Sequence, residues 1–106
     1  MLRQLTPKEL HSGLSDGADF SLLDIREPWE VAICRLANAV QIPMFTIPDK
    51  LSEIKQLQPL VVYCHHGIRS VQVCHYLAQQ GIEHVYNLAG GIERWADEIE
   101  PQMARY

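Results

Sequence analysis

The chain of 106 residues has 47% hydrophobic residues and a formal net charge of −4 at pH 7. This length and composition predict one globular domain over residues 1–106. The acidic balance argues against nucleic-acid binding, and the apolar runs are too short for a membrane span or a signal peptide, so we expect a cytoplasmic protein with neither nucleic acid nor membrane as a partner.

The first helix is predicted from the capping residues at its N-terminus. Thr6 can cap a helix, Pro7 suits the first helical position, and Glu9 can bond back to Thr6. These residues predict a helix that runs to about Leu14.

The rest of the chain alternates strand and helix patterns. Apolar, β-rich runs predict strands at 20–24, 39–42, 60–63 and 84–88. Helical spacing and start signals predict helices at 27–33, 47–57, 69–80 and 92–99. This alternation predicts an α/β sheet with helices on both faces, and reactive loops gather at the carboxyl ends of such strands.

Cys64 stands at one of these strand ends, directly after the apolar run 60–63. A short loop then leads into a helical pattern that opens with Arg69. Backbone N–H groups of such a loop can point at the sulfur, and the helix adds its positive end, so the thiolate is favoured. The thiolate is the nucleophilic form of cysteine, which predicts covalent catalysis.

The size of the loop narrows the chemistry. Four residues separate Cys64 from Arg69, enough for a tight cradle around one sulfur and one atom bonded to it. Gly67 can supply a positive φ, Arg69 can hold an anion or tie the loop, and the Ser70 hydroxyl can donate to the sulfur or cap the helix.

Four segments together resemble the single-domain rhodaneses, which are sulfurtransferases. They are Leu-Asp-Ile-Arg-Glu-Pro-Trp-Glu at 23–30, Ala-Val-Gln-Ile-Pro at 39–43, Val-Tyr-Cys-His-His-Gly-Ile-Arg-Ser at 62–70, and the stretch 85–95 with its Gly-Gly-Ile-Glu-Arg-Trp end. The loop is most similar to that of the rhodanese domain in enzymes that adenylylate sulfur-carrier proteins. The resemblance implies a rhodanese-like α/β fold with a central five-stranded, mostly parallel sheet and helices on both faces.

The resemblance also implies a reaction of the thiosulfate:cyanide sulfurtransferase type. Cys64 would take sulfane sulfur from thiosulfate or a similar donor as a persulfide and pass it to a thiol or cyanide. The loop would bind the substrate through His65, His66, Gly67, Ile68, Arg69 and Ser70. No cofactor is implied. Adjacent residues such as Cys64, His65 and His66 cannot easily converge on one ion, so we expect no metal site.

Other functions of the same fold stay open. The chain could be a sulfur-relay carrier or a binding module that a partner protein loads with sulfur. Such a partner could be a cysteine desulfurase or a sulfur-carrier protein. A rhodanese-fold phosphatase or arsenate reductase is a further alternative, although phosphatases of the fold have a loop one residue longer. Residues 32–36 replace the family's frequent Gly-His-Ile, and His65 and His66 stand where thiosulfate enzymes often carry a fixed cation.

The remaining candidates have a structural and a functional interpretation. Asp24 and Arg26 either tie a loop or brace the Cys64 loop from behind. Cys34 and Cys74 are interpreted as packing residues, with Cys34 alternatively a second thiol that resolves a Cys64 persulfide. We expect Trp29 and Trp95 to pack, with Trp29 at the rim of the site.

Overall fold

The computed structural model describes residues 2–106, and a five-stranded sheet forms its centre. The strands are β1 (Arg3–Leu5), β2 (Ser21–Asp24), β3 (Val40–Gln41), β4 (Leu60–Tyr63) and β5 (Val85–Leu88). They lie in the order β1-β5-β4-β2-β3, and each neighbouring pair is parallel. The predicted α/β fold is therefore confirmed, with a sheet that is wholly rather than mostly parallel.

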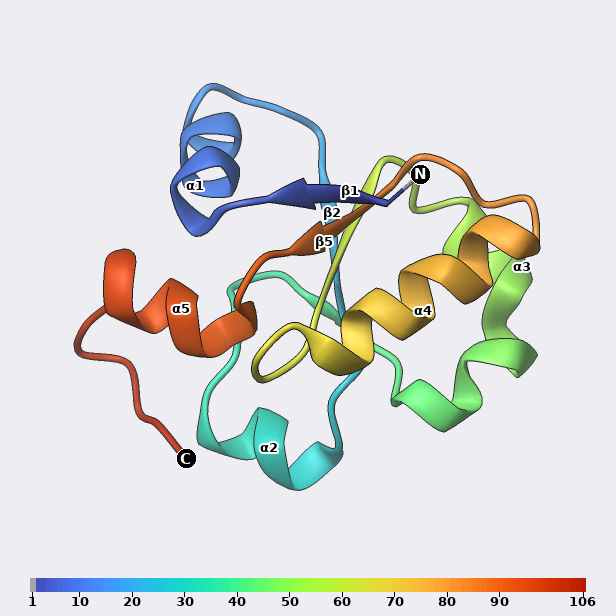
Figure 1. Cartoon of the computed structure of the whole chain (residues 1–106). Helices are drawn as coiled ribbons and strands as arrows, with labels where there is room; N and C mark the ends of the chain where they lie inside the picture. The colour runs from blue at the N-terminus through green and yellow to red at the C-terminus, as the bar shows by residue number, and fades with distance from the viewer. Residues whose placement is uncertain (1) are drawn as a thin grey trace.

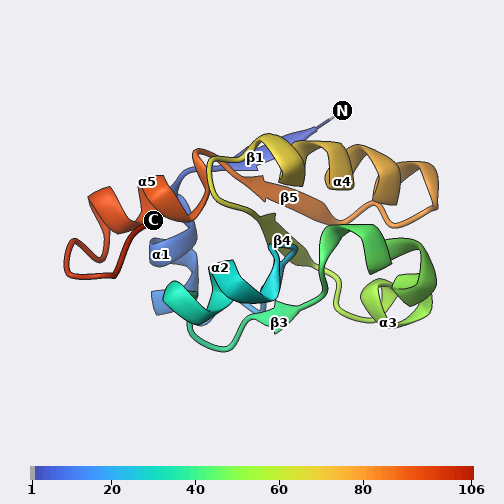
Figure 2. The ribbon, with the colours of Figure 1, turned by 90° about the horizontal axis from the view of Figure 1, so that it is seen from below.

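Helices cover both faces of the sheet (Figures 1 and 2). The helical segments are α1 (Pro7–Ser15), α2 (Pro28–Ile33), the 3₁₀ segment η1 (Met44–Lys50), α3 (Leu51–Lys55), α4 (Ile68–Gln79) and α5 (Gly91–Glu98). The helices α3 and α4 lie on one face, and α1 and α5 lie on the other (Figure 2). In residues 2–106 no helix combines the length and the apolar character needed to cross a bilayer.

Strand β4 lies at the centre of the sheet and is buried on both faces. Its side chains alternate, so Val62 packs into the core beneath α4 while Val61 and Tyr63 pack into the core beneath α1 and α5. All four β4 residues are fully buried. A strand held on both faces is a rigid base for the residue that follows it, which is Cys64.

Most predicted elements lie within one or two residues of their expected bounds, one differs, and one strand was not predicted. The single helix expected over 47–57 is wrong, because Pro48 keeps the chain in 3₁₀ geometry until a regular helix begins at Leu51. Strand β1 was not located by the sequence patterns, since it has three residues and its Arg3 and Gln4 are exposed. The Thr6–Glu9 capping box is present at the start of α1, as expected.

Candidate active site

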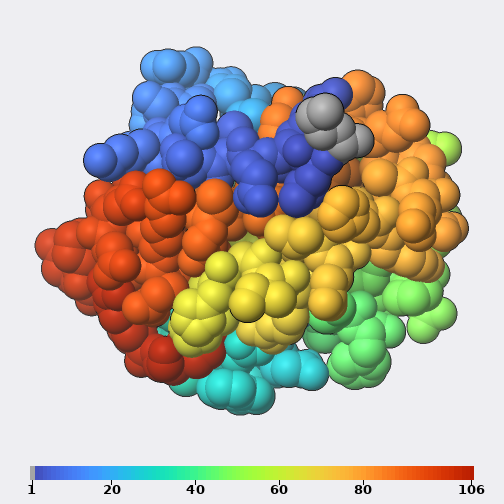
Figure 3. All heavy atoms as spheres, viewed as in Figure 1, coloured from blue at the N-terminus to red at the C-terminus, as the bar shows by residue number. Residues whose placement is uncertain are grey.

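Cys64 lies at the carboxyl edge of the sheet, immediately after β4. Because the sheet is parallel, the ends of β2 and β4 meet there, with Asp24 in register with Tyr63. The Cys64 side chain is only 1% exposed. The loop that follows reaches the surface between α2, α4 and the C-terminal residues (Figure 3).

Three groups surround the Cys64 sulfur. The N–H of Gly67 donates to Sγ at 3.2 Å, the N–H of Ser70 donates at 3.4 Å, and the Ser70 hydroxyl lies 3.3 Å away. Ser70 belongs to the first turn of α4, whose N-terminal end is positive. The sequence predicted that backbone N–H groups of the loop point at the sulfur, and the structure places those of Gly67 and Ser70 in hydrogen-bond range. Both N–H groups and the helix end stabilise negative charge at Sγ.

Gly67 shapes the turn that brings these donors to the sulfur. Its φ is +95°, in the left-handed region that favours glycine. A Cβ at this position would lie 3.2 Å from the backbone nitrogen of Gly90. Both conformation and space therefore favour glycine here.

The carbonyl groups of the loop are held by the start of α5. The N–H of Ile92 donates to the Cys64 carbonyl at 2.9 Å, and the N–H of Glu93 donates to the His65 carbonyl at 3.0 Å. A Cβ on Gly91 would lie 2.6 Å from the Cys64 carbonyl oxygen. The Gly90-Gly91 turn, interpreted from the sequence only as a backbone requirement, thus lets a helix dock directly beneath the loop.

Arg69 ties the loop to α2. Its guanidinium donates to both carboxylate oxygens of Glu30, at 2.7 and 2.9 Å. This pair lowers the pKa of Glu30 to about 2, chiefly through the hydrogen bonds from Arg69. Of the two roles that the sequence left open for Arg69, the structure shows the loop tie.

Two residues of this network were missed by the sequence analysis as site residues. Glu30 is buried and also accepts from the N–H of Glu27 at 2.8 Å. Tyr106 donates its hydroxyl to Glu30 at 2.8 Å and accepts from Arg26 at 3.0 Å. A glutamate three positions after a helix start is a capping-box signal that could have pointed to Glu30, whereas nothing in the sequence near Tyr106 indicates this contact.

Asp24 and Arg26 form a buried ion pair behind the loop. Arg26 donates to Asp24 through Nε at 2.9 Å and through Nη2 at 2.7 Å. Asp24 also accepts from the hydroxyl of Tyr63 at 2.8 Å, and Tyr63 precedes Cys64. Burial raises the pKa of Tyr63, so its hydroxyl stays neutral and remains a donor. The pair reaches the loop through Tyr63 and through Tyr106.

His65 and His66 lie differently, although they are neighbours. His65 is sandwiched between the rings of His66 and Tyr106, with centroids 3.9 and 3.8 Å away. Burial first, and the neighbouring His66 second, lower the pKa of His65. His66 is exposed, and Ile68 is 71% exposed at the start of α4. The lowered pKa favours the neutral form of His65 beside Cys64.

The other two cysteines do not reach the Cys64 sulfur through any described contact. Cys74 lies on the buried face of α4, and burial raises the pKa of its thiol to about 12. Cys34 is half-buried, with Sγ 3.9 Å from Nη1 of Arg26. Within residues 2–106, no group of three or more His, Cys, Asp or Glu side chains is placed to hold a metal ion.

Two hollows flank the Cys64 loop. One is bounded by Arg69 and Glu27 and by apolar residues around Met44 and Phe45, where Phe45 is 75% exposed. The other lies beside Gly67 and Ile68, over β1 and β5. Trp29 is 61% exposed and stacks edge-on against Tyr106, at the outer side of the site. Trp95 packs in the core, as expected.

Comparison with known proteins agrees with this arrangement. Residues 6–98 match the profile of the family described as Rhodanese-like domain. A protein named Sulfurtransferase from Allochromatium vinosum is 44% identical over 98% of this chain and 97% of its own length. The probable adenylyltransferase/sulfurtransferase MoeZ of Mycobacterium tuberculosis is 33% identical over 96% of this chain, which corresponds to 26% of that longer protein.

A solved structure supports the same grouping. The rhodanese-like domain protein of Staphylococcus aureus superposes with a TM-score of 0.84 at 34% identity, covering 92% of this chain and 95% of that one. With a profile match across most of the chain and relatives of similar length and sequence, the chain belongs to the rhodanese-like domain family.

Proposed function

We propose that the protein is a sulfurtransferase in which Cys64 carries the transferred sulfur as a persulfide. The observation that supports this most is the enclosure of the Cys64 sulfur by the N–H groups of Gly67 and Ser70 and by the Ser70 hydroxyl. The relatives named as sulfurtransferases support the same reaction class.

In the first step the Cys64 thiolate attacks the outer sulfur of a donor. With thiosulfate, the new S–S bond forms as the donor's own S–S bond breaks, and sulfite leaves with the electron pair. The N–H groups of Gly67 and Ser70 stabilise the Cys64 thiolate before this step and the Cys64 persulfide anion after it.

In the second step a thiophilic acceptor removes the sulfane sulfur. An acceptor thiolate attacks the outer sulfur, the S–S bond to Cys64 breaks, and the Cys64 thiolate is restored as the leaving group. Cyanide reacts in the same way and leaves as thiocyanate. The proton of an acceptor thiol goes to solvent before the attack.

The size of the loop supports sulfur transfer over phosphate chemistry. Four residues lie between Cys64 and Arg69, and Arg69 is held by Glu30. An oxyanion would have to compete with that carboxylate for the guanidinium. A phosphatase or arsenate reductase function therefore has less support.

A second candidate is a sulfur relay in which a partner protein loads Cys64. Arg26 behind the loop and Arg69 within it are each paired with a carboxylate. A dianionic small donor gains little from neutralised guanidinium groups, which favours an organic persulfide supplied by a protein such as a cysteine desulfurase.

Intact-protein mass spectrometry distinguishes these functions. After incubation with thiosulfate, we expect a gain of one sulfur atom that is lost in Cys64→Ser and retained in the control Cys74→Ala. A gain that appears only with a desulfurase and cysteine would identify the relay. Absence of any gain, together with Cys64-dependent hydrolysis of an aryl phosphate, would overturn the proposal.

A further inference from the structure

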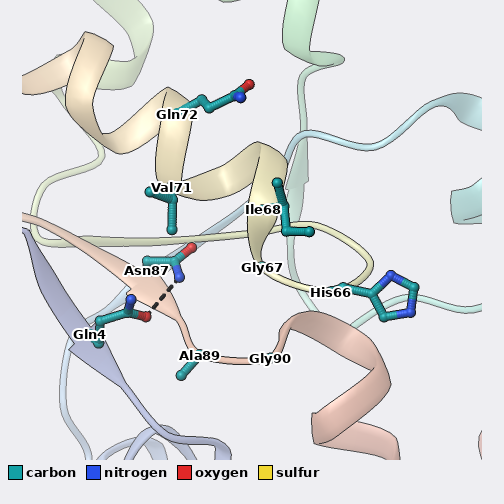
Figure 4. A pocket seen from close by; sticks show the side chains of 9 residues that line it. All are labelled: Gln4, His66, Gly67, Ile68, Val71, Gln72, Asn87, Ala89 and Gly90. Atoms are coloured by element: carbon teal, nitrogen blue, oxygen red, sulfur yellow. Dashed lines mark hydrogen bonds between the residues drawn. The ribbon is translucent and has the colours of Figure 1, made fainter.

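A pocket of about 450 Å³ lies on the α4 face of the sheet, beside the Cys64 loop. Its floor is formed by Gln4 of β1 and Asn87 of β5, and its wall by Val71 and Gln72 of α4 (Figure 4). We name it the amide pocket after the three carboxamide side chains among these four residues. It is large enough to hold a ligand the size of a short peptide.

The floor of the amide pocket contains a buried polar atom without a partner. Asn87 is 1% exposed, and its Nδ2 donates to Oε1 of Gln4 at 2.8 Å. Within residues 2–106, Oδ1 of Asn87 has no hydrogen-bond partner, and it is turned away from Gln4 toward α4 (Figure 4). An acceptor left buried and unpaired is destabilising, so a ligand that pairs with it gains a favourable contact.

The orphaned atom does not depend on how the amides are oriented. If both carboxamides are turned over, the same pair forms with donor and acceptor exchanged, and one polar atom of Asn87 is still unpaired. A ligand that offers both an N–H and a C=O satisfies either orientation. A peptide group is such a ligand.

The lining of the amide pocket selects against charge. Its polar side chains are Gln4, Gln72, Asn87 and the exposed His66, while Val71 and Ile68 supply apolar surface. Among the described residues 2–106, no Asp, Glu, Lys or Arg side chain lines it. This combination suits uncharged polypeptide backbone better than a small anion such as thiosulfate.

The amide pocket shares a residue with the sulfur cradle. Gly67 lines the pocket, and its N–H donates to Sγ of Cys64 at 3.2 Å. Ile68, which is 71% exposed, stands at the pocket rim. A chain lying in the pocket therefore passes directly beside the loop that holds the reacting sulfur.

We propose that the amide pocket binds the backbone of a polypeptide whose cysteine exchanges sulfur with Cys64. This inference rests on the proposed sulfurtransferase function and names its partner as a peptide-borne thiol. The partner thiolate attacks the sulfane sulfur of Cys64, the S–S bond to Cys64 breaks, and the partner leaves as a persulfide. Because the reverse step uses the same contacts, the pocket serves loading and unloading alike.

The test uses Cys64 loaded chemically with inorganic polysulfide, so that it does not depend on the physiological donor. The probe acceptor is the peptide acetyl-Gly-Cys-Gly-amide, and the reference acceptor is 2-mercaptoethanol. Loss of the persulfide is followed by rapid-quench mass spectrometry. In Asn87→Leu, the ratio of the peptide rate to the reference rate should fall about 3- to 10-fold, as expected for one lost hydrogen bond between uncharged groups.

A second variant fills the pocket without touching its amides. Val71→Phe should lower the same ratio at least as much, whereas the matched control Val40→Phe, on the edge strand β3, should leave it unchanged. Methylating every backbone nitrogen of the probe peptide should lower the ratio of its rate to the 2-mercaptoethanol rate in the wild-type protein. Since a folding defect slows both acceptors, the ratio isolates the pocket.

The outcomes separate this inference from the function on which it rests. If Cys64 takes up no sulfur from any donor, the sulfurtransferase proposal fails. If it is loaded but Asn87→Leu and Val71→Phe leave the ratio at the wild-type value, the pocket holds water only and the inference is overturned.

Discussion

The guanidinium of Arg69 donates two hydrogen bonds, of 2.7 and 2.9 Å, to the carboxylate of Glu30 on α2. The arginine that closes the active loop is thus neutralised within the protein. The loop is fixed at its far end by an ion pair, and the stabilisation of the sulfur falls to backbone N–H groups and the Ser70 hydroxyl.

Replacing Glu30 by Gln should destabilise the fold in a pH-dependent way. At pH 7 we expect a loss of about 1–3 kcal/mol in the free energy of unfolding, measured by urea denaturation. The folded-state pKa of Glu30 is about 2, below its ordinary 4.5, so the carboxylate stabilises the fold above pH 4.5. The gap between wild type and Glu30→Gln should therefore close as the pH falls from 4.5 toward 2.

The matched control for this experiment is Glu53→Gln. Glu53 forms an exposed ion pair with Lys50 at 3.6 Å, so its loss should cost at most about 0.5 kcal/mol. A Glu30→Gln variant as stable as Glu53→Gln at pH 7 would contradict the structural role given to the Arg69–Glu30 pair.

Gly67→Ala should damage activity far more than it damages stability. Gly67 and Gly81 both have positive φ, +95° and +84°, so alanine at either costs about 1 kcal/mol. Only at Gly67 does the new Cβ meet backbone, 3.2 Å from the Gly90 nitrogen. We expect sulfur loading of Cys64 to slow about 10- to 100-fold in Gly67→Ala and to stay normal in Gly81→Ala. Equal rates in the two variants would refute this account of the cradle.

Ser70→Ala removes the hydroxyl beside the sulfur and leaves the Ser70 N–H in place. A hydrogen bond to a charged group is worth about 1.5–3 kcal/mol, so kcat/KM for sulfur transfer should fall about 10- to 100-fold. The control Ser12→Ala, in the last turns of α1, should behave as wild type. Unchanged kinetics in Ser70→Ala would show that the backbone N–H groups suffice.

A fixed cation at the loop should favour thiosulfate. His66 is exposed, and His66→Lys adds a permanent positive charge that attracts a dianion by about 1 kcal/mol or more at low salt, raising kcat/KM for thiosulfate several-fold. The gain should shrink between low salt and 0.5 M salt because the charges are then screened. His84→Lys, exposed just before β5, makes the same charge change away from the loop. An equal gain there would mean that net charge alone is responsible.

The two thiols outside the loop, Cys34 and Cys74, should differ in their reaction with iodoacetamide. Cys74 is buried and its pKa is raised to about 12, so it should stay unmodified at pH 8 until urea unfolds the protein. The half-buried Cys34 is the comparison within the same chain. Peptide mapping after timed labelling measures both, and modification of native Cys74 as fast as Cys34 would argue against its packing role.

The sequence patterns predicted the parts of the fold that depend on interactions between residues close together in the chain. The buried run before Cys64, the Thr6–Glu9 capping box and the glycine at position 67 each appear in the structure where their patterns placed them. Each is governed by periodicity, capping or φ, which act within a few residues of the chain.

The parts that escaped prediction depend on contacts between distant segments. Glu30 and Tyr106 meet although 76 positions apart, and no local pattern encodes that hydrogen bond. The same holds for Gln4 and Asn87, which become neighbours only when β1 pairs with β5. The single helix expected over 47–57 is wrong for a local reason. Its apolar spacing predicted a regular helix across Pro48, which does not allow one there.

The docking of α5 beneath the loop has a consequence for the surroundings of Cys64. The N–H groups of Ile92 and Glu93 donate to the carbonyl groups of Cys64 and His65. The peptide groups of the loop are therefore oriented by a helix that lies more than 25 residues later in the chain. The donors around the Cys64 sulfur belong to the same loop, so their orientation depends on a helix that follows them in the chain. A chain truncated before Gly91 loses both contacts, and we expect its Cys64 to lack the ordered surroundings seen here.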